Sequence, residues 1–182
     1  MSWHSCGHYL NKSLKPVEEE INKILIIDDD EDVLLAAKML LKRHIKEVVI
    51  EKDPRKIPFL LNNDSYDIIL LDMNFSQDTT SGKEGFYWLE QILDKDPQAV
   101  VILITAFGDV EMAVQALKAG ATDFVLKPWQ NEKLLATLSS ASRLKKSYKE
   151  VNQLKQTSKT LQADSSKAFK DIIGDSEAIK NP

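Results

Sequence analysis

Short apolar runs alternate with amphipathic stretches along the middle of the chain. The runs are rich in Val, Ile and Leu and lack polar alternation, which is typical of strands buried on both faces of a parallel sheet. Five of them lie at residues 24–27, 47–51, 68–71, 100–104 and 123–126. The pattern therefore predicts five parallel β-strands.

Each apolar run is followed by apolar residues at helical spacing. The predicted helices cover residues 33–41, 54–61, 86–93 and 110–117, and a last helical pattern begins at Leu134. The first helix is expected to bury Val33, Ala37, Leu40 and Leu41. Asp30 stands where an N-cap is expected, and Gly120 is a natural C-terminal stop. Because crossovers between parallel strands are right-handed, we expect a doubly wound α/β domain over residues 23–142.

The two ends of the chain differ from this domain. Residues 1–22 are polar and aperiodic, and we interpret them as an N-terminal extension that has no signal-peptide apolar segment. His4, Cys6 and His8 could bind a metal ion, but their spacing is not that of a structural zinc site.

The tail of the chain carries a heptad-like pattern. Its a and d positions fall on Leu144, Ser147, Val151, Leu154, Ser158 and Leu161. Four apolar residues in six positions are a moderate-to-weak coiled-coil signal. We interpret residues 143–168 as a helical linker, and pairing as a coiled coil is one of two open alternatives. The alternative is a solvated helix that merely extends the last helix of the domain.

Composition limits the number of domains and the cellular compartment that are expected for the protein. A chain of 182 residues with 43% hydrophobic and 29% charged residues fits one globular domain with extensions. Cys6 is the single cysteine, so no internal disulfide can form and a reducing, cytoplasmic setting is expected. The longest apolar run, 99–107, is too short to span a bilayer, so we expect no membrane partner. The net charge of −4 does not decide for or against nucleic acid.

Chemically active residues follow the predicted strands. Asp28 and Asp29 follow the first strand, Asp72 the third, Thr105 the fourth and Lys127 the fifth. The carboxyl ends of parallel strands form the ligand-binding edge of such a sheet. Crowded carboxylates attract Mg²⁺, a carboxylate beside that ion can attack phosphorus, and a lysine can neutralise phosphoryl oxygens. The sequence therefore predicts phosphoryl-transfer chemistry without a glycine-rich phosphate loop, since neither GxxxxGK[ST] nor GxGxxG occurs.

Taken singly, these residues have simpler explanations. Asp30 is expected to be only a helix cap, Thr105 could cap the following helix, and Lys127 could be a solvated loop lysine. Their order along the chain is what favours a shared site.

Four segments together resemble the receiver domain of bacterial two-component response regulators. They are KILIIDDDEDV from Lys23, YDIILLDM from Tyr66, VILITAFG from Val101 and GATDFVLKP from Gly120. The resemblance covers about 120 residues and implies a flavodoxin-like fold with strand order 2-1-3-4-5. It also implies a domain that phosphorylates and dephosphorylates itself rather than a turnover enzyme.

The resemblance assigns a role to each residue of the site. Asp72 would be the phosphoacceptor, and Mg²⁺ would be held by Asp29 directly, by Asp28 through water and by the backbone carbonyl of Asn74. Thr105 would be the switch hydroxyl and Lys127 the phosphoryl-binding cation. Phe124 would be the rotating aromatic of the switch, and the Lys127–Pro128 bond is a candidate for the cis form.

One segment departs from the family pattern. The proline usual three residues after the phosphoacceptor is absent, and Glu84-Gly85, which resembles the usual Asp-Gly pair, comes about five residues late. The loop over residues 74–85 is therefore longer and more polar than is usual, and its role is open.

The C-terminal segment FKDIIGDSEAIKNP, from Phe169, resembles the opening of the AAA+ domain of sigma-54-dependent response regulators. We therefore interpret residues 169–182 as the start of an AAA+ domain that is missing from this chain. No Walker motif follows, so no ATPase is expected in this chain. Contacts with DNA and with sigma-54 polymerase would depend on the missing domains.

The resemblance implies a phosphoacceptor that a sensor histidine kinase loads. It also implies a homodimer through the predicted elements at 110–117 and 123–126, the last helix and the linker. A phosphorylation-independent interaction module with the same fold is the main alternative. A phosphatase of the haloacid dehalogenase type is a third, because Asp28 and Asp30 form a DxD motif; Asp32, where Thr or Val is expected, argues against it.

Overall fold

The computed structural model describes residues 21–75, 82–106 and 110–174. A single five-stranded sheet forms its centre, and every neighbouring pair of strands is parallel. The strands are β1 (Lys23–Ile27), β2 (Glu47–Glu51), β3 (Ile68–Asp72), β4 (Val101–Ala106) and β5 (Asp123–Lys127). Their order is β2-β1-β3-β4-β5, which confirms the predicted fold class.

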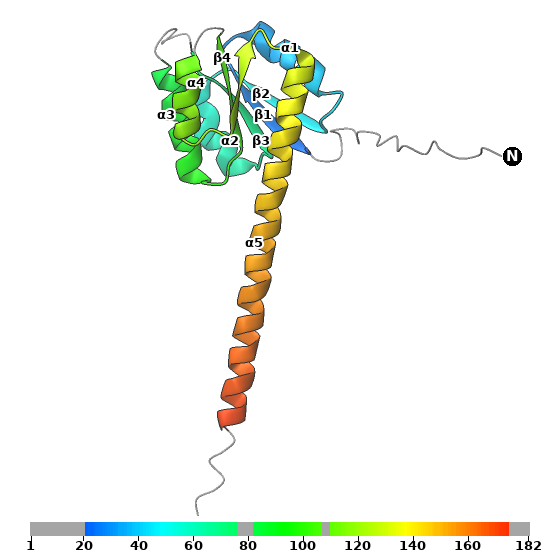
Figure 1. Cartoon of the computed structure of the whole chain (residues 1–182), viewed down its shortest axis with the longest axis vertical. Helices are drawn as coiled ribbons and strands as arrows, with labels where there is room; N and C mark the ends of the chain where they lie inside the picture. The colour runs from blue at the N-terminus through cyan, green and yellow to red at the C-terminus, as the bar shows by residue number, and fades with distance from the viewer. Residues whose placement is uncertain (1–20, 76–81, 107–109, 175–182) are drawn as a thin grey trace, which may run out of the picture.

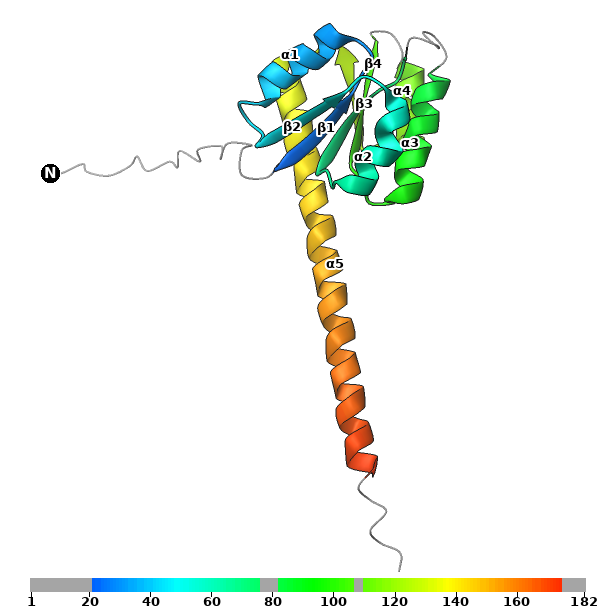
Figure 2. The same cartoon turned by 180° about the vertical axis from the view of Figure 1, so that it is seen from behind.

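Helices cover both faces of the sheet (Figures 1 and 2). They are α1 (Glu31–Leu41), the 3₁₀ helix η2 (Pro54–Lys56), α2 (Ile57–Asn63), α3 (Lys83–Lys95), α4 (Val110–Lys118) and α5 (Asn131–Gly174). Successive side chains of a strand point to opposite faces, so β1 divides its residues between two cores. Ile24 and Ile26 pack with α1 and α5, whereas Leu25 and Ile27 pack with α2, α3 and α4.

Local signals in the sequence set the ends of two helices as predicted. The Asp30 side chain accepts hydrogen bonds from the backbone N–H groups of Asp32 and Val33, at 2.9 and 3.3 Å, and so caps α1. Gly120 has a φ of 106° and follows α4, where its N–H donates to the carbonyl of Leu117. Both predicted helix boundaries are therefore confirmed.

Two burial predictions need correction. In α1 the buried residues are Leu34, Ala37 and Leu41, while Val33 and Leu40 are only half-buried. The buried face of α1 is therefore turned by one position relative to the prediction. The expectation that all strands are buried on both faces is wrong for the two edge strands, because β2 has no buried residue and β5 is half-buried except at Val125.

The last helix is continuous from Asn131 to Gly174, a length of 44 residues. It packs on the sheet through its first turns and then extends away from the domain (Figure 1). No break occurs at 142–143 or at 168–169, where the sequence suggested a change of segment. None of the helices in the described ranges is both long and apolar enough to cross a membrane.

Several predicted features lie outside the described residues. These are His4, Cys6 and His8, most of the N-terminal extension, residues 76–81 of the long loop, and the segment from 175 to 182.

Candidate phosphoryl-transfer site

The carboxyl edge of the sheet brings the predicted site residues together. Asp28 directly follows β1, Asp72 ends β3, Thr105 is the penultimate residue of β4 and Lys127 ends β5. Asp72 lies in register with Ile104 of β4, one residue before Thr105. Because all strands run in the same direction, four separate segments deliver their polar residues to one edge.

Asp28, Asp29 and Asp72 form an acidic cluster at this edge. One carboxylate oxygen from each lies within 4.8 Å of the others. Asp28 is fully buried and Asp72 is 2% exposed, whereas Asp29 is half-buried. Three hard oxygen donors with an opening at Asp29 fit a divalent cation such as Mg²⁺, which keeps part of its water shell.

Burial makes the acidic cluster costly to ionise. Burial, followed by the charge of Asp28, raises the pKa of Asp72 to about 7. Burial also raises the pKa of Asp28, against the opposing effect of Lys127. A bound divalent cation would relieve this repulsion, so the electrostatics of the cluster favour the same ligand as its geometry.

Lys127 connects the acidic cluster to the last strand. Its Nζ lies 2.7 Å from Oδ2 of Asp28 and 3.0 Å from Oδ1 of Asp72. Burial lowers the pKa of Lys127, but the charges of Asp72 and Asp28 outweigh this effect and leave the pKa raised. Lys127 is therefore a charged member of the site, and its interpretation as a solvated loop lysine is wrong. The Lys127–Pro128 peptide bond is cis, as expected.

Thr105 presents an unsatisfied hydroxyl beside the acidic cluster. The residue is 1% exposed, and among the described residues its Oγ1 has no hydrogen-bond partner. Thr105 lies inside β4, and α4 begins only at Val110, so the helix-cap explanation is wrong. Buried polar groups are nearly always hydrogen-bonded, so this hydroxyl indicates a position where a polar ligand binds. Phe124 of β5 is half-buried and packs against the core beneath α2, α3 and α4.

Two glycines shape the loop after Asp72. The sequence alone did not show why these two positions require glycine. A Cβ on Gly85 would lie 2.7 Å from the backbone of Met73, so only glycine lets the start of α3 approach this segment. Gly82 has a φ of 63° and stands just before α3. Asn74 has a buried Oδ1 that, within the described ranges, finds no hydrogen-bond partner.

A polar cleft of about 370 Å³ reaches the acidic cluster at Asp29. Besides Asp29, its lining includes Lys52, Asp53 and Arg55 from the segment after β2, and Phe75 and Glu84 from the segment after β3. Lys52 directly follows β2, as Asp28 follows β1, but it was not among the predicted site residues. The other four lie farther from the strand ends, so the pattern of strand ends did not predict them. The acidic cluster is therefore open to solvent on the side of Asp29.

Comparisons with known proteins agree with this geometry. Residues 24–139 match the family described as response regulator receiver domain, which is more than half of the chain. The protein therefore belongs to the response regulator receiver family, as its sequence indicated. The phosphatase interpretation is accordingly set aside.

Individual relatives cover this part of the chain. The chemotaxis protein CheY of Listeria monocytogenes is 33% identical over 125 residues, which are 66% of this chain and 98% of CheY. The response regulator protein PilR of Pseudomonas aeruginosa is 32% identical over 123 residues, which are 68% of this chain and 26% of PilR. The chain thus spans only about a quarter of the length of PilR.

Among solved structures, the N-terminal signal receiver domain of a response regulator from Bacteroides fragilis is 38% identical. Its TM-score is 0.61, and the match covers 67% of this chain and 97% of that domain.

Proposed function

We propose that the chain is a phosphoacceptor receiver that takes a phosphoryl group from a sensor histidine kinase onto Asp72. The observation that supports this most strongly is the burial of Asp72 beside Asp28, with Lys127 in contact with both. The acidic cluster would hold Mg²⁺ through Asp29, Asp72 and, by way of water, Asp28, together with the carbonyl of Asn74. The bound ion would neutralise the phosphoryl oxygens.

In the proposed reaction, a carboxylate oxygen of Asp72 attacks the phosphorus of phosphohistidine. The new bond joins this oxygen to phosphorus as the bond from phosphorus to the histidine nitrogen breaks, and the product is an acyl phosphate. Lys127 exchanges part of its contact with the carboxylates for a phosphoryl oxygen. Water later attacks the phosphorus, which releases inorganic phosphate and restores the carboxylate.

The proposed switch starts at Thr105. The Oγ1 of Thr105, which has no hydrogen-bond partner in the part of the chain that the structure describes, is available to donate a hydrogen bond to the new phosphoryl group. Movement of Thr105 toward the phosphoryl group would vacate space into which Phe124, one strand away, can rotate. The effect would reach the face formed by α4, β5 and α5, because all three elements pack beside this strand pair.

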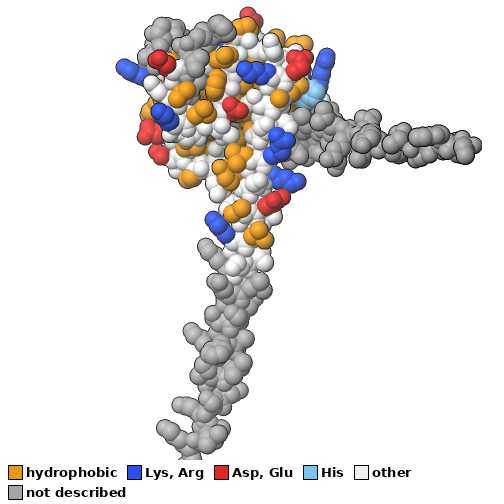
Figure 3. All heavy atoms as spheres, in the orientation of Figure 1, with side chains coloured by type: hydrophobic (Ala, Val, Ile, Leu, Met, Phe, Trp, Pro, Cys, Tyr) orange, Lys and Arg blue, Asp and Glu red, His pale blue; other side chains and the backbone are white. Residues whose placement is uncertain are grey.

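The output we propose is dimerisation that controls a sigma-54-dependent transcription activator in the cytoplasm. Exposed apolar residues support the dimer: Val114 and Leu117 on α4 are 45% and 40% exposed, and Val151 and Leu154 on α5 are 46% and 70% exposed. Figure 3 shows hydrophobic side chains interspersed with charged ones on the face of the molecule that carries α4 and α5. The activator type rests on the C-terminal segment that begins at Phe169.

Intact mass tests the proposed chemistry. After incubation with acetyl phosphate and Mg²⁺, the wild type should gain one phosphoryl group, and EDTA should prevent the gain. Asp72→Asn should gain none, and Lys127→Ala should react about 100-fold more slowly, as when one charge-stabilising donor is removed.

If the wild type gains no mass and also fails to bind beryllofluoride, the proposal is wrong and the phosphorylation-independent interaction module is favoured. Equal phosphorylation of Asp72→Asn would instead show that Asp72 is not the acceptor.

A further inference from the structure

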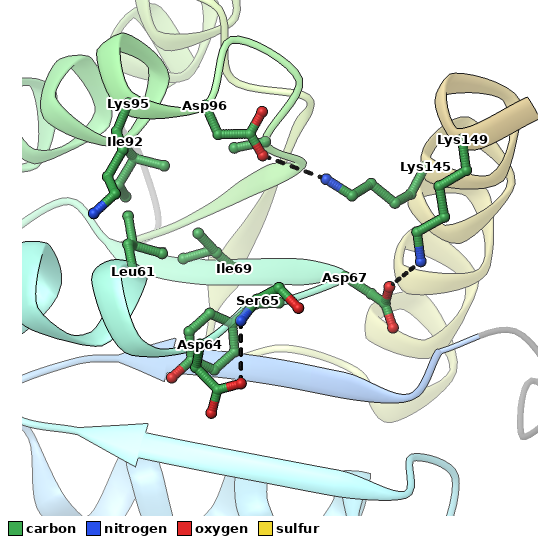
Figure 4. Close-up of a pocket in the computed structure, with 12 residues that line it drawn as sticks. Leu61, Asp64, Ser65, Asp67, Ile69, Ile92, Lys95, Asp96, Lys145 and Lys149 are labelled. Atoms are coloured by element: carbon green, nitrogen blue, oxygen red, sulfur yellow. Dashed lines mark hydrogen bonds and ion pairs between the residues drawn. The ribbon is translucent and has the colours of Figure 1, made fainter. Parts of the chain in front are cut away.

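The far edge of the sheet, opposite the acidic cluster, holds the beginning of the extended part of α5. Lys149 places its Nζ 2.6 Å from Oδ1 of Asp67, just before β3. Asn152 donates a hydrogen bond of 2.6 Å to the side chain of Gln98, and Lys145 donates one of 3.2 Å to the Gln98 carbonyl. We call these contacts of Lys145, Lys149 and Asn152 the latch; Figure 4 shows its lysines reaching from α5.

The latch is built into partly buried surroundings. The side chains of Asp67 and Lys145 are only 12% and 14% exposed. Asp67 also accepts hydrogen bonds from the backbone N–H groups of Asn22 and Lys23, at 2.8 and 3.3 Å. These bonds hold its carboxylate in place independently of α5. Lys145 additionally lies 3.6 Å from Asp96. A cavity of about 300 Å³ separates α5 from α3 at this point, so polar contacts replace apolar packing there.

The latch and the predicted heptad residues occupy different sides of α5. At 3.6 residues per turn each residue advances by about 100°, so the latch residues lie within about 60° of one another. Leu144, Val151 and Leu154, which we call the apolar stripe, centre about 140° away around the same helix. Val151 and Leu154 are 46% and 70% exposed and Leu144 is half-buried, so the latch leaves the last two residues of the apolar stripe open.

The geometry points to a conformational device: the latch fixes the direction and rotation of α5 relative to the receiver while the apolar stripe pairs with a second copy. The inference deepens the proposed function, since the second copy is the partner proposed above. While the latch is closed, each receiver and the α5 helix of the same chain move as one rigid unit within the dimer. Loosening the latch should leave the pair intact but free the receivers to take many orientations.

Distances measured within one chain test the latch. Spin labels on Glu90→Cys and Thr157→Cys, in a full-length Cys6→Ser chain diluted with unlabelled protein, report the separation of α3 from α5. The parent chain should give one narrow distance peak. The latch variant, Lys145→Met with Lys149→Met and Asn152→Ala, should lose this peak and give a broad distribution.

The control makes similar substitutions, of a lysine and of a side-chain amide, at exposed positions of α5. Lys146→Met with Gln153→Ala lies outside both the latch and the apolar stripe, and should keep the narrow peak. A narrow peak in the latch variant, or equal broadening in the control, would overturn the inference.

Two further readouts separate this inference from the proposed function. Mass gain with acetyl phosphate should be unchanged in the latch variant, because the latch lies at the edge opposite Asp72. The dimer mass measured by light scattering should also be unchanged. If the parent chain neither phosphorylates nor dimerises, the proposed function fails, whereas the spin-label comparison still decides whether the latch holds α5. If only the latch variant loses its dimer, the apolar stripe does not pair independently and the inference is wrong.

Discussion

The carboxylate of Asp72 is held where ionisation is unfavourable. Its folded-state pKa of about 7 lies above that of an unfolded aspartate, so ionised Asp72 destabilises the fold at neutral and higher pH. We therefore predict that Asp72→Asn raises the free energy of unfolding at pH 8 by about 1–3 kcal/mol in the absence of divalent cations. Urea unfolding in EDTA measures this difference.

The same comparison has a pH control. As pH falls from 7 toward 4, Asp72 becomes protonated in the folded state and the advantage of the variant should shrink. A variant less stable than wild type at pH 8 would mean that the contact of Asp72 with Lys127 outweighs the cost of burial.

Gly85 offers a second prediction at the scale of one residue. Replacing a helical glycine with alanine ordinarily stabilises by up to about 1 kcal/mol. At Gly85 the added Cβ would come within 2.7 Å of the Met73 backbone, so Gly85→Ala should instead destabilise by about 1–3 kcal/mol. Because Met73 adjoins Asp72, phosphorylation by acetyl phosphate should slow as well.

Thermal or urea unfolding checks the sign of this effect. The exposed Glu90→Ala on the same helix should show only the small effect of helix propensity. A Gly85→Ala protein as stable as wild type would show that α3 can move away from Met73 without cost.

At the scale of elements, Asp67 ties three segments together. Burial alone would raise the pKa of Asp67, but hydrogen bonds from Lys149 and from the backbone of Asn22 and Lys23 outweigh it and hold the pKa below its ordinary value. The stabilisation is therefore complete above about pH 4 and is lost as pH falls through the lowered pKa. Asp67→Asn should cost about 1 kcal/mol of unfolding free energy at pH 7.

Unfolding measured from pH 6 to pH 3 tests this prediction. The difference between Asp67→Asn and wild type should narrow as pH drops below about 4, whereas the exposed Asp94→Asn should show no such trend. A difference that stays constant with pH would mean that the ionisation of Asp67 contributes nothing to stability.

The elements that the sequence predicted are those that local signals determine. The cap at Asp30 and the stop at Gly120 depend on neighbouring residues, and the site residues follow from strand ends that parallel topology must gather at one edge. Helical spacing alone could not decide between Val33 and Leu34, which are adjacent on the helix. That choice depends on how α1 meets the sheet.

Contacts between segments far apart in the chain could not be predicted from the local sequence pattern. Asp67 and Lys149 are 82 residues apart, and each is an ordinary charged residue in its own segment. Gly85 illustrates the same limit, because a side chain at this position is excluded by the backbone of Met73, which lies across the loop. The sequence could place Gly85 near the start of a helix, but only the packing of α3 explains why no side chain fits there.

At the scale of the whole molecule, the exposed stripe on α5 predicts how the chain associates. Val151 and Leu154 lie on the side of α5 away from the latch, so within one chain they meet water rather than a core. Beyond the latch, α5 extends away from the domain (Figure 1). Burying two such side chains against a second copy is worth about 1.5–3 kcal/mol each. Val151→Asp with Leu154→Asp should therefore weaken the dimer by at least about 100-fold, since it also places like charges in contact across the pair.

Sedimentation equilibrium across a range of protein concentrations measures this change. Lys146→Glu with Gln153→Glu serves as the control, because it adds negative charge to the same turns of α5 away from the stripe and should weaken the dimer far less. Phosphorylation of Asp72 should be unaffected in both variants, because neither residue pair lies at the carboxyl edge of the sheet. If the stripe variant dimerises as wild type does, the exposed face of α4 at Val114 and Leu117 becomes the surface to test next.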